Sequence, residues 1–130
     1  MKKSGASAIV FCVFLAIGLL SACSSEPTDE IFRYVSNEPL TINLLAAPDG
    51  GMAYVKMSGY QVDMTSQAAL TAMEEEPIKV KDCFASVFHL KTKDDLINSL
   101  DEIRAEIIEA LSEAFDTHSI ETIYFDQIVW

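Results

Sequence analysis

Alternating apolar and polar positions predict two neighbouring strands in the first half of the chain. Residues 40–45 alternate in this way and predict a strand. Pro-Asp-Gly-Gly at residues 48–51 is a strong turn signal, and a second strand is predicted over residues 52–64. Its apolar alternation changes phase at Gly59, where a bulge would return all the apolar side chains to one face. We therefore expect an antiparallel hairpin.

Apolar positions spaced three to four residues apart predict helices in the second half. The first helix is expected over residues 66–76. Pro77 opens the second, whose apolar stripe is Val80, Cys83, Phe84, Val87 and Phe88. Residues 92–95 resemble a capping box, and the longest helix is predicted from Lys93 to Phe115. Its stripe consists of Leu96, Leu100, Ile103, Ile107 and Leu111, and its glutamates are expected to face water.

A final strand is predicted over residues 120–130, which are rich in β-branched and aromatic side chains. Residues 31–35 are compatible with a short strand or with part of a tether. Strands, then helices, then a strand predict an α+β domain. We expect a small antiparallel sheet with two to three helices on one face.

The beginning of the chain predicts export. A basic start, Met1-Lys2-Lys3, precedes an uncharged apolar run over residues 8–20, and small residues follow. This is the layout of a secretory signal. A membrane-spanning helix needs about 20 apolar residues, so the run is short for an uncleaved signal anchor, which is the alternative.

Residues 20–23, Leu-Ser-Ala-Cys, resemble the lipobox of bacterial lipoproteins. In that class the chain is cut between the residues equivalent to Ala22 and Cys23, and the cysteine thiol takes a diacylglyceryl group. An ordinary signal peptide with an accidental cysteine is the alternative. Ser24 follows the cysteine, where an aspartate commonly retains lipoproteins at the inner membrane, so the outer membrane is favoured. The predicted organisation is a signal peptide over 1–22, a lipidated N-terminus and tether over 23–37, and a domain over 38–130.

The net charge limits the classes of binding partner, and the number of cysteines limits the possible disulfides. Removing residues 1–22 takes away Lys2 and Lys3 and leaves seven basic residues against 20 acidic ones, a net charge near −13. Nucleic-acid binding rests on Lys and Arg that neutralise phosphates, so no nucleic-acid partner is expected. Direct docking on anionic lipid heads is disfavoured for the same reason. With Cys12 removed and Cys23 alkylated, Cys83 has no partner for an internal disulfide.

Catalytic and metal-binding patterns are not found in the sequence. His89 and His118 have no Cys, His or Asp neighbours at metal-ligand spacing. Cys83 lies on an apolar stripe, where a thiol usually behaves as a small hydrophobe. Glu74, Glu75 and Glu76 lack the spaced oxygen ligands of a calcium loop and are interpreted as a solvated helix end. We therefore expect no enzyme activity, no metal and no cofactor.

Residues 123–130, Ile-Tyr-Phe-Asp-Gln-Ile-Val-Trp, resemble the ending of the FliL family of flagellar basal-body-associated proteins. Further segments resemble the family in the same order: residues 39–44, 48–51, 54–57, 77–82, 92–96 and 103–111. The resemblance covers about residues 38–130. It implies a periplasmic domain related in fold to the stomatin-type (SPFH) domain, located beside the flagellar stator and supporting swimming or swarming. It implies no enzymatic activity and no cofactor.

Two features depart from the family pattern. FliL proteins usually enter the inner membrane through a transmembrane helix, whereas this chain has a lipobox, and it ends at Trp130 without the family's terminal glutamine. We therefore expect a divergent paralogue.

The expected partners are a membrane, reached through the lipid on Cys23, and stator or basal-body proteins, with a homo-oligomer as a further possibility. A general periplasmic lipoprotein that reuses the fold as an interaction module is the alternative. The hairpin and the edge of the C-terminal strand are candidate contact surfaces. Tyr124 and Trp130 are candidate interface anchors, with packing in the core as the competing interpretation.

Overall fold

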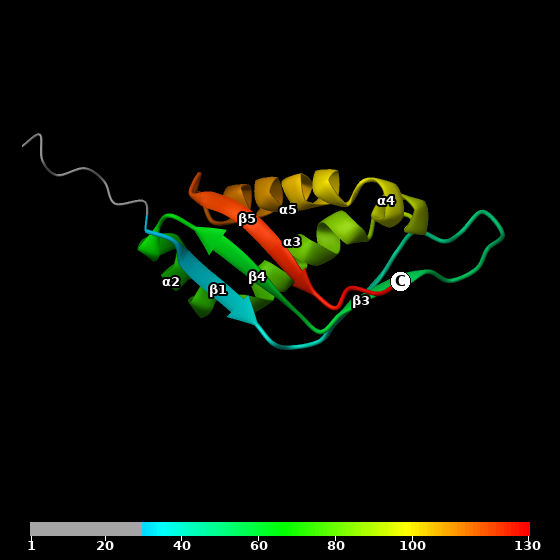
Figure 1. The fold of residues 1–130 in the computed structure, drawn as a ribbon, viewed down its shortest axis with the longest axis horizontal. Coiled ribbons are helices and arrows are strands. Elements are labelled where there is room, and N and C mark those ends of the chain that lie inside the picture. The colour runs from blue at the N-terminus through cyan, green and yellow to red at the C-terminus, as the bar shows by residue number, and fades with distance from the viewer. Residues whose placement is uncertain (1–29) are drawn as a thin grey trace, which may run out of the picture.

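Strands and helices form separate layers (Figure 1). The computed structural model describes residues 30–130, which form five strands and four helices. One antiparallel sheet has the strand order β1-β4-β5 and comprises β1 (Phe32–Ser36), β4 (Gly59–Met64) and β5 (Ile120–Asp126). A two-stranded antiparallel sheet comprises β2 (Leu40–Asn43) and β3 (Tyr54–Met57). The helices are α2 (Gln67–Glu75), α3 (Pro77–Phe88), α4 (Lys93–Asn98) and α5 (Leu100–Ala114). The predicted α+β class and the predicted hairpin are confirmed.

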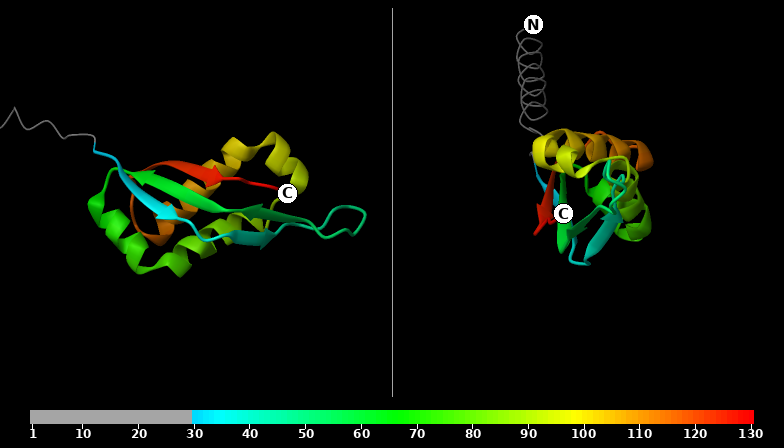
Figure 2. Two further views of the ribbon diagram at one scale, coloured as in Figure 1. Left: turned by 60° about the horizontal axis from the view of Figure 1, so that its bottom comes forward. Right: turned by 90° about the vertical axis from the view of Figure 1, so that its right-hand side faces the viewer.

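The core lies between the helices and one face of the larger sheet (Figures 1 and 2). Val62 of the central strand β4 faces Tyr34 of β1 and Ile123 of β5, and all three side chains are buried. The α3 stripe is buried as predicted, and the ring centroids of Phe84 and Tyr60 lie 4.2 Å apart. From α5 the core receives Ile103, Ile107 and Leu111. Each large apolar side chain buried here contributes about 1.5–3 kcal/mol, so this layer provides most of the driving force for folding.

The single strand predicted over residues 52–64 is wrong, because the structure divides it at Ser58 into β3 and β4. The predicted change of phase is nevertheless found, since Val55, Met57, Tyr60 and Val62 are all fully buried. Gly59 marks the division because a Cβ atom there would collide with the carbonyl oxygen of Ser36. The division lets β3 pair with β2 while β4 pairs with β1 and β5.

The long helix predicted over residues 93–115 is also divided, at Ser99, into α4 and α5. The break accounts for the fourth helix. Asn98 and Ser99 are poor helix formers that favour caps and turns, and Ser99 has φ −136° and ψ 33°. The predicted capping box is confirmed: Thr92 Oγ1 accepts from Asp95 N at 3.2 Å, and Asp95 Oδ2 accepts from Thr92 N at 2.9 Å.

The C-terminal strand is shorter than the predicted range of 120–130. It ends at Asp126, because Gln127 adopts a positive φ of 48° that interrupts the extended backbone. Val129 then pairs with Lys56 of β3 through two backbone hydrogen bonds of 2.8 Å. The last residues therefore join the two sheets.

The folded part begins before residue 38. Strand β1 pairs with β4 over its whole length, and its Tyr34 and Ser36 side chains are buried. Residues 32–36, which the sequence leaves open between a short strand and part of a tether, therefore form a strand that contributes to the core. Within residues 30–130, none of the helices has both the length and the apolar character needed to cross a membrane.

Candidate interaction surfaces

The larger sheet has one face that the helices do not cover (Figure 2). Arg33 of β1 lies on this face and forms a bidentate ion pair with Asp63 of β4. The Arg33 Nε–Asp63 Oδ1 distance is 2.6 Å, and the Nη2–Oδ2 distance is 2.8 Å. The Arg33 guanidinium also lies 5.6 Å from the centroid of the Tyr124 ring in β5. We call these three residues the Arg33 clasp, because one side chain contacts both other strands.

The electrostatics of the clasp follow from its geometry. The hydrogen bonds from Arg33 hold the pKa of the Asp63 carboxyl below its ordinary value, although desolvation by burial opposes the effect. The same bonds raise the pKa of Arg33. The Asp63 side chain is only 10% exposed, whereas that of Arg33 is 49% exposed. Without Arg33, the nearly buried Asp63 carboxylate would have no counter-charge. Such an unpaired buried charge destabilises the folded state.

Tyr124 and Trp130 both lie at the surface. Tyr124 is 45% exposed on the uncovered sheet face, and Trp130 is 42% exposed beside Val129. Neither side chain belongs to the buried core. The structure leaves both accessible to a partner, but it does not bring them together, since Tyr124 lies within β5 and Trp130 follows the kink at Gln127.

The second candidate surface is a groove beside the hairpin. The connection between β2 and β3 extends from one end of the molecule (Figure 1) and is tied to the α3–α4 loop by a 2.9 Å hydrogen bond from Leu45 N to Lys91 O. A hollow of about 310 Å³ separates this connection from the start of α4; its lining residues are Leu45, Ala47, Pro48, Ala53, Thr92, Lys93 and Asp94. Met52, in the same connection, is 88% exposed.

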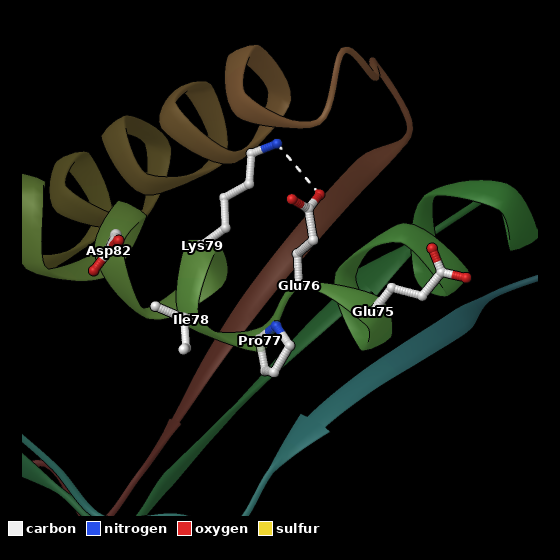
Figure 3. A pocket seen from close by; sticks show the side chains of 6 residues that line it. All are labelled: Glu75, Glu76, Pro77, Ile78, Lys79 and Asp82. Atoms are coloured by element: carbon white, nitrogen blue, oxygen red, sulfur yellow. Dashed lines mark hydrogen bonds and ion pairs between the residues drawn. The ribbon is translucent and has the colours of Figure 1, made fainter.

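The third candidate surface is a hollow of about 330 Å³ where α2 meets α3 (Figure 3). Ile78 is 72% exposed here, and the Lys79 Nζ–Glu76 Oε2 distance is 3.4 Å. Glu75 and Asp82 point to opposite sides, so their carboxylates do not converge (Figure 3). In the part of the chain that the structure describes, no group of three His, Cys, Asp or Glu side chains could hold a metal ion.

The candidate nucleophile Cys83 and the two histidines lie apart from one another. Cys83 is buried in α3, and burial raises the pKa of its thiol, which disfavours the thiolate that a nucleophile needs. His89 is exposed at the end of α3, with Nδ1 3.3 Å from the Asn43 carbonyl oxygen, and His118 is exposed in the α5–β5 loop. No hydrogen bond within residues 30–130 joins either histidine to Cys83. These positions contain no assembled nucleophile and base.

Comparison with protein families decides the identity of the domain. A model described as flagellar basal body-associated protein FliL matches residues 34–130, from the middle of β1 to Trp130. The chain belongs to the FliL family. This confirms the resemblance found in the sequence, and it implies association with the flagellar basal body and with motility in general. FliL proteins are structural accessories of the flagellum rather than known enzymes. A search of curated proteins found no significant match.

Three residues, Ala22, Cys23 and Arg33, lie before residue 34 and so outside this match. Ala22 and Cys23, the predicted cleavage and lipidation residues, lie outside the described residues. The sequence does not predict the Arg33 clasp, because residues 31–35 are compatible with either a short strand or part of a tether. Opposite charges at Arg33 and Asp63 were visible in the sequence, but only the register that pairs β1 with β4 places them face to face.

Proposed function

We propose that this FliL-family chain is a non-enzymatic lipoprotein that works on the periplasmic side of the envelope, beside the flagellar stator or basal body. The observation that carries the proposal is the presence of a FliL domain over residues 34–130 directly after a lipobox at residues 20–23. The domain supports flagellum-dependent swimming or swarming and needs no cofactor. Its partners are stator or basal-body proteins, and copies of the chain assemble with one another.

The anchor follows from the chemistry of the lipobox. Cleavage after Ala22 makes Cys23 the first residue, and its thiol carries the diacylglyceryl group. One acyl chain gives only marginal membrane binding, whereas two or three hold a protein stably. Ser24 is not an aspartate, which favours the outer membrane, so the domain faces the motor from the side opposite to a transmembrane FliL.

Lipid labelling and localisation test this proposal. An epitope placed between Ser25 and Glu26 lies outside the FliL match, so the tagged domain keeps its surfaces. Wild type is expected to incorporate an alkyne-bearing fatty acid, to fractionate with membranes and to form foci at the bases of stained flagella. Cys23→Ala is expected to lose the label and the foci, while Cys83→Ala serves as the matched control and keeps both.

Two other outcomes would contradict parts of the proposal. A labelled protein distributed evenly round the cell would argue for a general envelope lipoprotein that reuses the fold. An unlabelled protein with intact foci would remove the lipid anchor but leave the association with the basal body.

A further inference from the structure

The chain enters the fold directly through an edge strand. Glu30 and Ile31 lead straight into β1, which pairs with β4 on one side only. Any segment joined before residue 30 is therefore attached to the body of the protein through β1. The connection between β2 and β3 extends at the opposite end, and the strands of the larger sheet run roughly along the line between these two ends (Figures 1 and 2).

This arrangement determines how the backbone hydrogen bonds between β1 and β4 respond to an applied force. Backbone hydrogen bonds in an antiparallel pair lie perpendicular to the strands. A force along β1 shears all five β1–β4 residue pairs, Phe32↔Met64 to Ser36↔Tyr60, at the same time. A force that separates Phe32 from Met64 sideways instead opens the pairs one after another. The ladder is therefore stronger along the strand than across it.

The Arg33 clasp lies in the second residue pair from the end where the chain enters. Its bidentate ion pair crosses from β1 to β4, and its contact with the Tyr124 ring reaches β5. Bidentate Arg–carboxylate pairs are directional as well as strong, so sliding β1 by one residue would break both hydrogen bonds. Phe32, Tyr34 and Ser36 pack on the core side of the same strand and resist the same displacement.

We propose that β1 is the strand through which this protein resists mechanical force, and that the Arg33 clasp holds it to β4 and β5 against a pull directed along the strand from the N-terminal side. The inference rests on the proposed function in one respect, namely that an anchor before residue 30 supplies the pull. The strength of the strand is a property of the fold, and it is measured without flagella or membranes.

Optical tweezers on the full-length chain in detergent test the proposal. In one pair of handles, azide-bearing residues replace Glu30 and Met52, so that force runs along β1. In the other pair they replace Glu30 and Thr65, so that force separates the ends of β1 and β4 at one side of the sheet. We expect the first geometry to rupture at a several-fold higher force at equal loading rate. Equal forces in the two geometries would overturn the proposal.

Arg33→Lys tests the clasp in the first geometry. Lysine keeps the charge but loses the planar, bidentate fork and its stacking on the tyrosine ring. We expect the rupture force to fall, because forced unfolding follows the unfolding barrier. Arg104→Lys is the matched control, since Arg104 also has an ion pair, with Asp101 at 2.7 Å, and lies over an aromatic ring, that of Phe125, but belongs to α5.

The control is expected to rupture at the wild-type force. Arg33→Lys could instead have the same rupture force and the same melting temperature as wild type. That result would contradict a role for the clasp in the resistance of β1 to force. Equal effects of both substitutions would show a general loss of stability and would likewise contradict the clasp. Neither result depends on lipidation or motility, so failure here is distinguishable from failure of the proposed function.

Discussion

Arg33 is half exposed, yet it contacts side chains from two other strands. Its partner Asp63 is nearly buried, and this asymmetry determines what each substitution would do. Loss of Arg33 leaves a buried carboxylate without its counter-charge, whereas loss of the Asp63 charge leaves an arginine that water can solvate. We therefore expect Arg33→Ala, which removes the counter-charge, to lower the melting temperature more than the isosteric Asp63→Asn does.

Asp63→Asn is expected to make stability less sensitive to acid. The folded pKa of Asp63 is lowered, so its charge stabilises the protein above the ordinary carboxyl pKa of about 3.9, and this contribution disappears as pH falls toward the lower folded value. At pH 7 we expect a loss of about 1 kcal/mol, reduced by the exposure of Arg33. Urea unfolding between pH 7 and pH 3 should show the difference from wild type shrinking, with Glu102→Gln as the exposed control. A difference that stays constant with pH would contradict the assignment.

Gly59→Ala is expected to destabilise the protein by about 1–3 kcal/mol, as overpacking of a rigid contact does. The added Cβ would meet the carbonyl oxygen of Ser36, which is backbone and part of the β1–β4 ladder. Gly51→Ala is the control, because its Cβ would lie 3.1 Å from the movable Asp49 side chain. Thermal unfolding of both variants checks this, and equal melting temperatures would show that Gly59 has no such constraint.

At the scale of elements, the sequence predicts the apolar stripes better than it predicts where elements end. The α3 stripe and the capping box at Thr92 follow from local periodicity and local hydrogen bonding, and both are found. The break at Ser58 depends on packing between distant segments, because Gly59 must approach the Ser36 backbone. That contact is not visible in a local pattern, and the same dependence on a distant partner strand leaves β1 open in the sequence. The break at Ser99 coincides with two poor helix formers, Asn98 and Ser99, but the longer apolar stripe across it favours one continuous helix.

Thr92→Ala tests the capping box as a separate element. The Thr92 hydroxyl accepts from the Asp95 backbone N–H, and loss of such a cap costs typically about 1 kcal/mol. Thr71→Ala in α2 is the matched control, because its hydroxyl donates to the Gln67 carbonyl within an exposed helix. Chemical denaturation should separate the two variants. An equal loss of stability in both would show that the cap contributes nothing specific.

At the scale of the whole molecule, an acidic FliL-family domain follows a segment whose residues 20–23 are predicted to form a lipobox. The family could be predicted from the order of short motifs along the chain, and the fold class from the order of the predicted strands and helices. The uncovered sheet face could not, because it depends on which strands become neighbours. The β2–β3 connection lies at one end of the molecule, and β1 begins near the other end (Figure 1).

Motility of a clean deletion strain tests the central claim most directly. Spreading would be measured in soft agar and in viscous medium, with flagella counted by electron microscopy. The account predicts reduced motility with normal filament numbers, restored by the wild-type gene and by Cys83→Ala but not by Cys23→Ala. Unchanged motility of the deletion strain in viscous medium would contradict a role for this protein at the working motor.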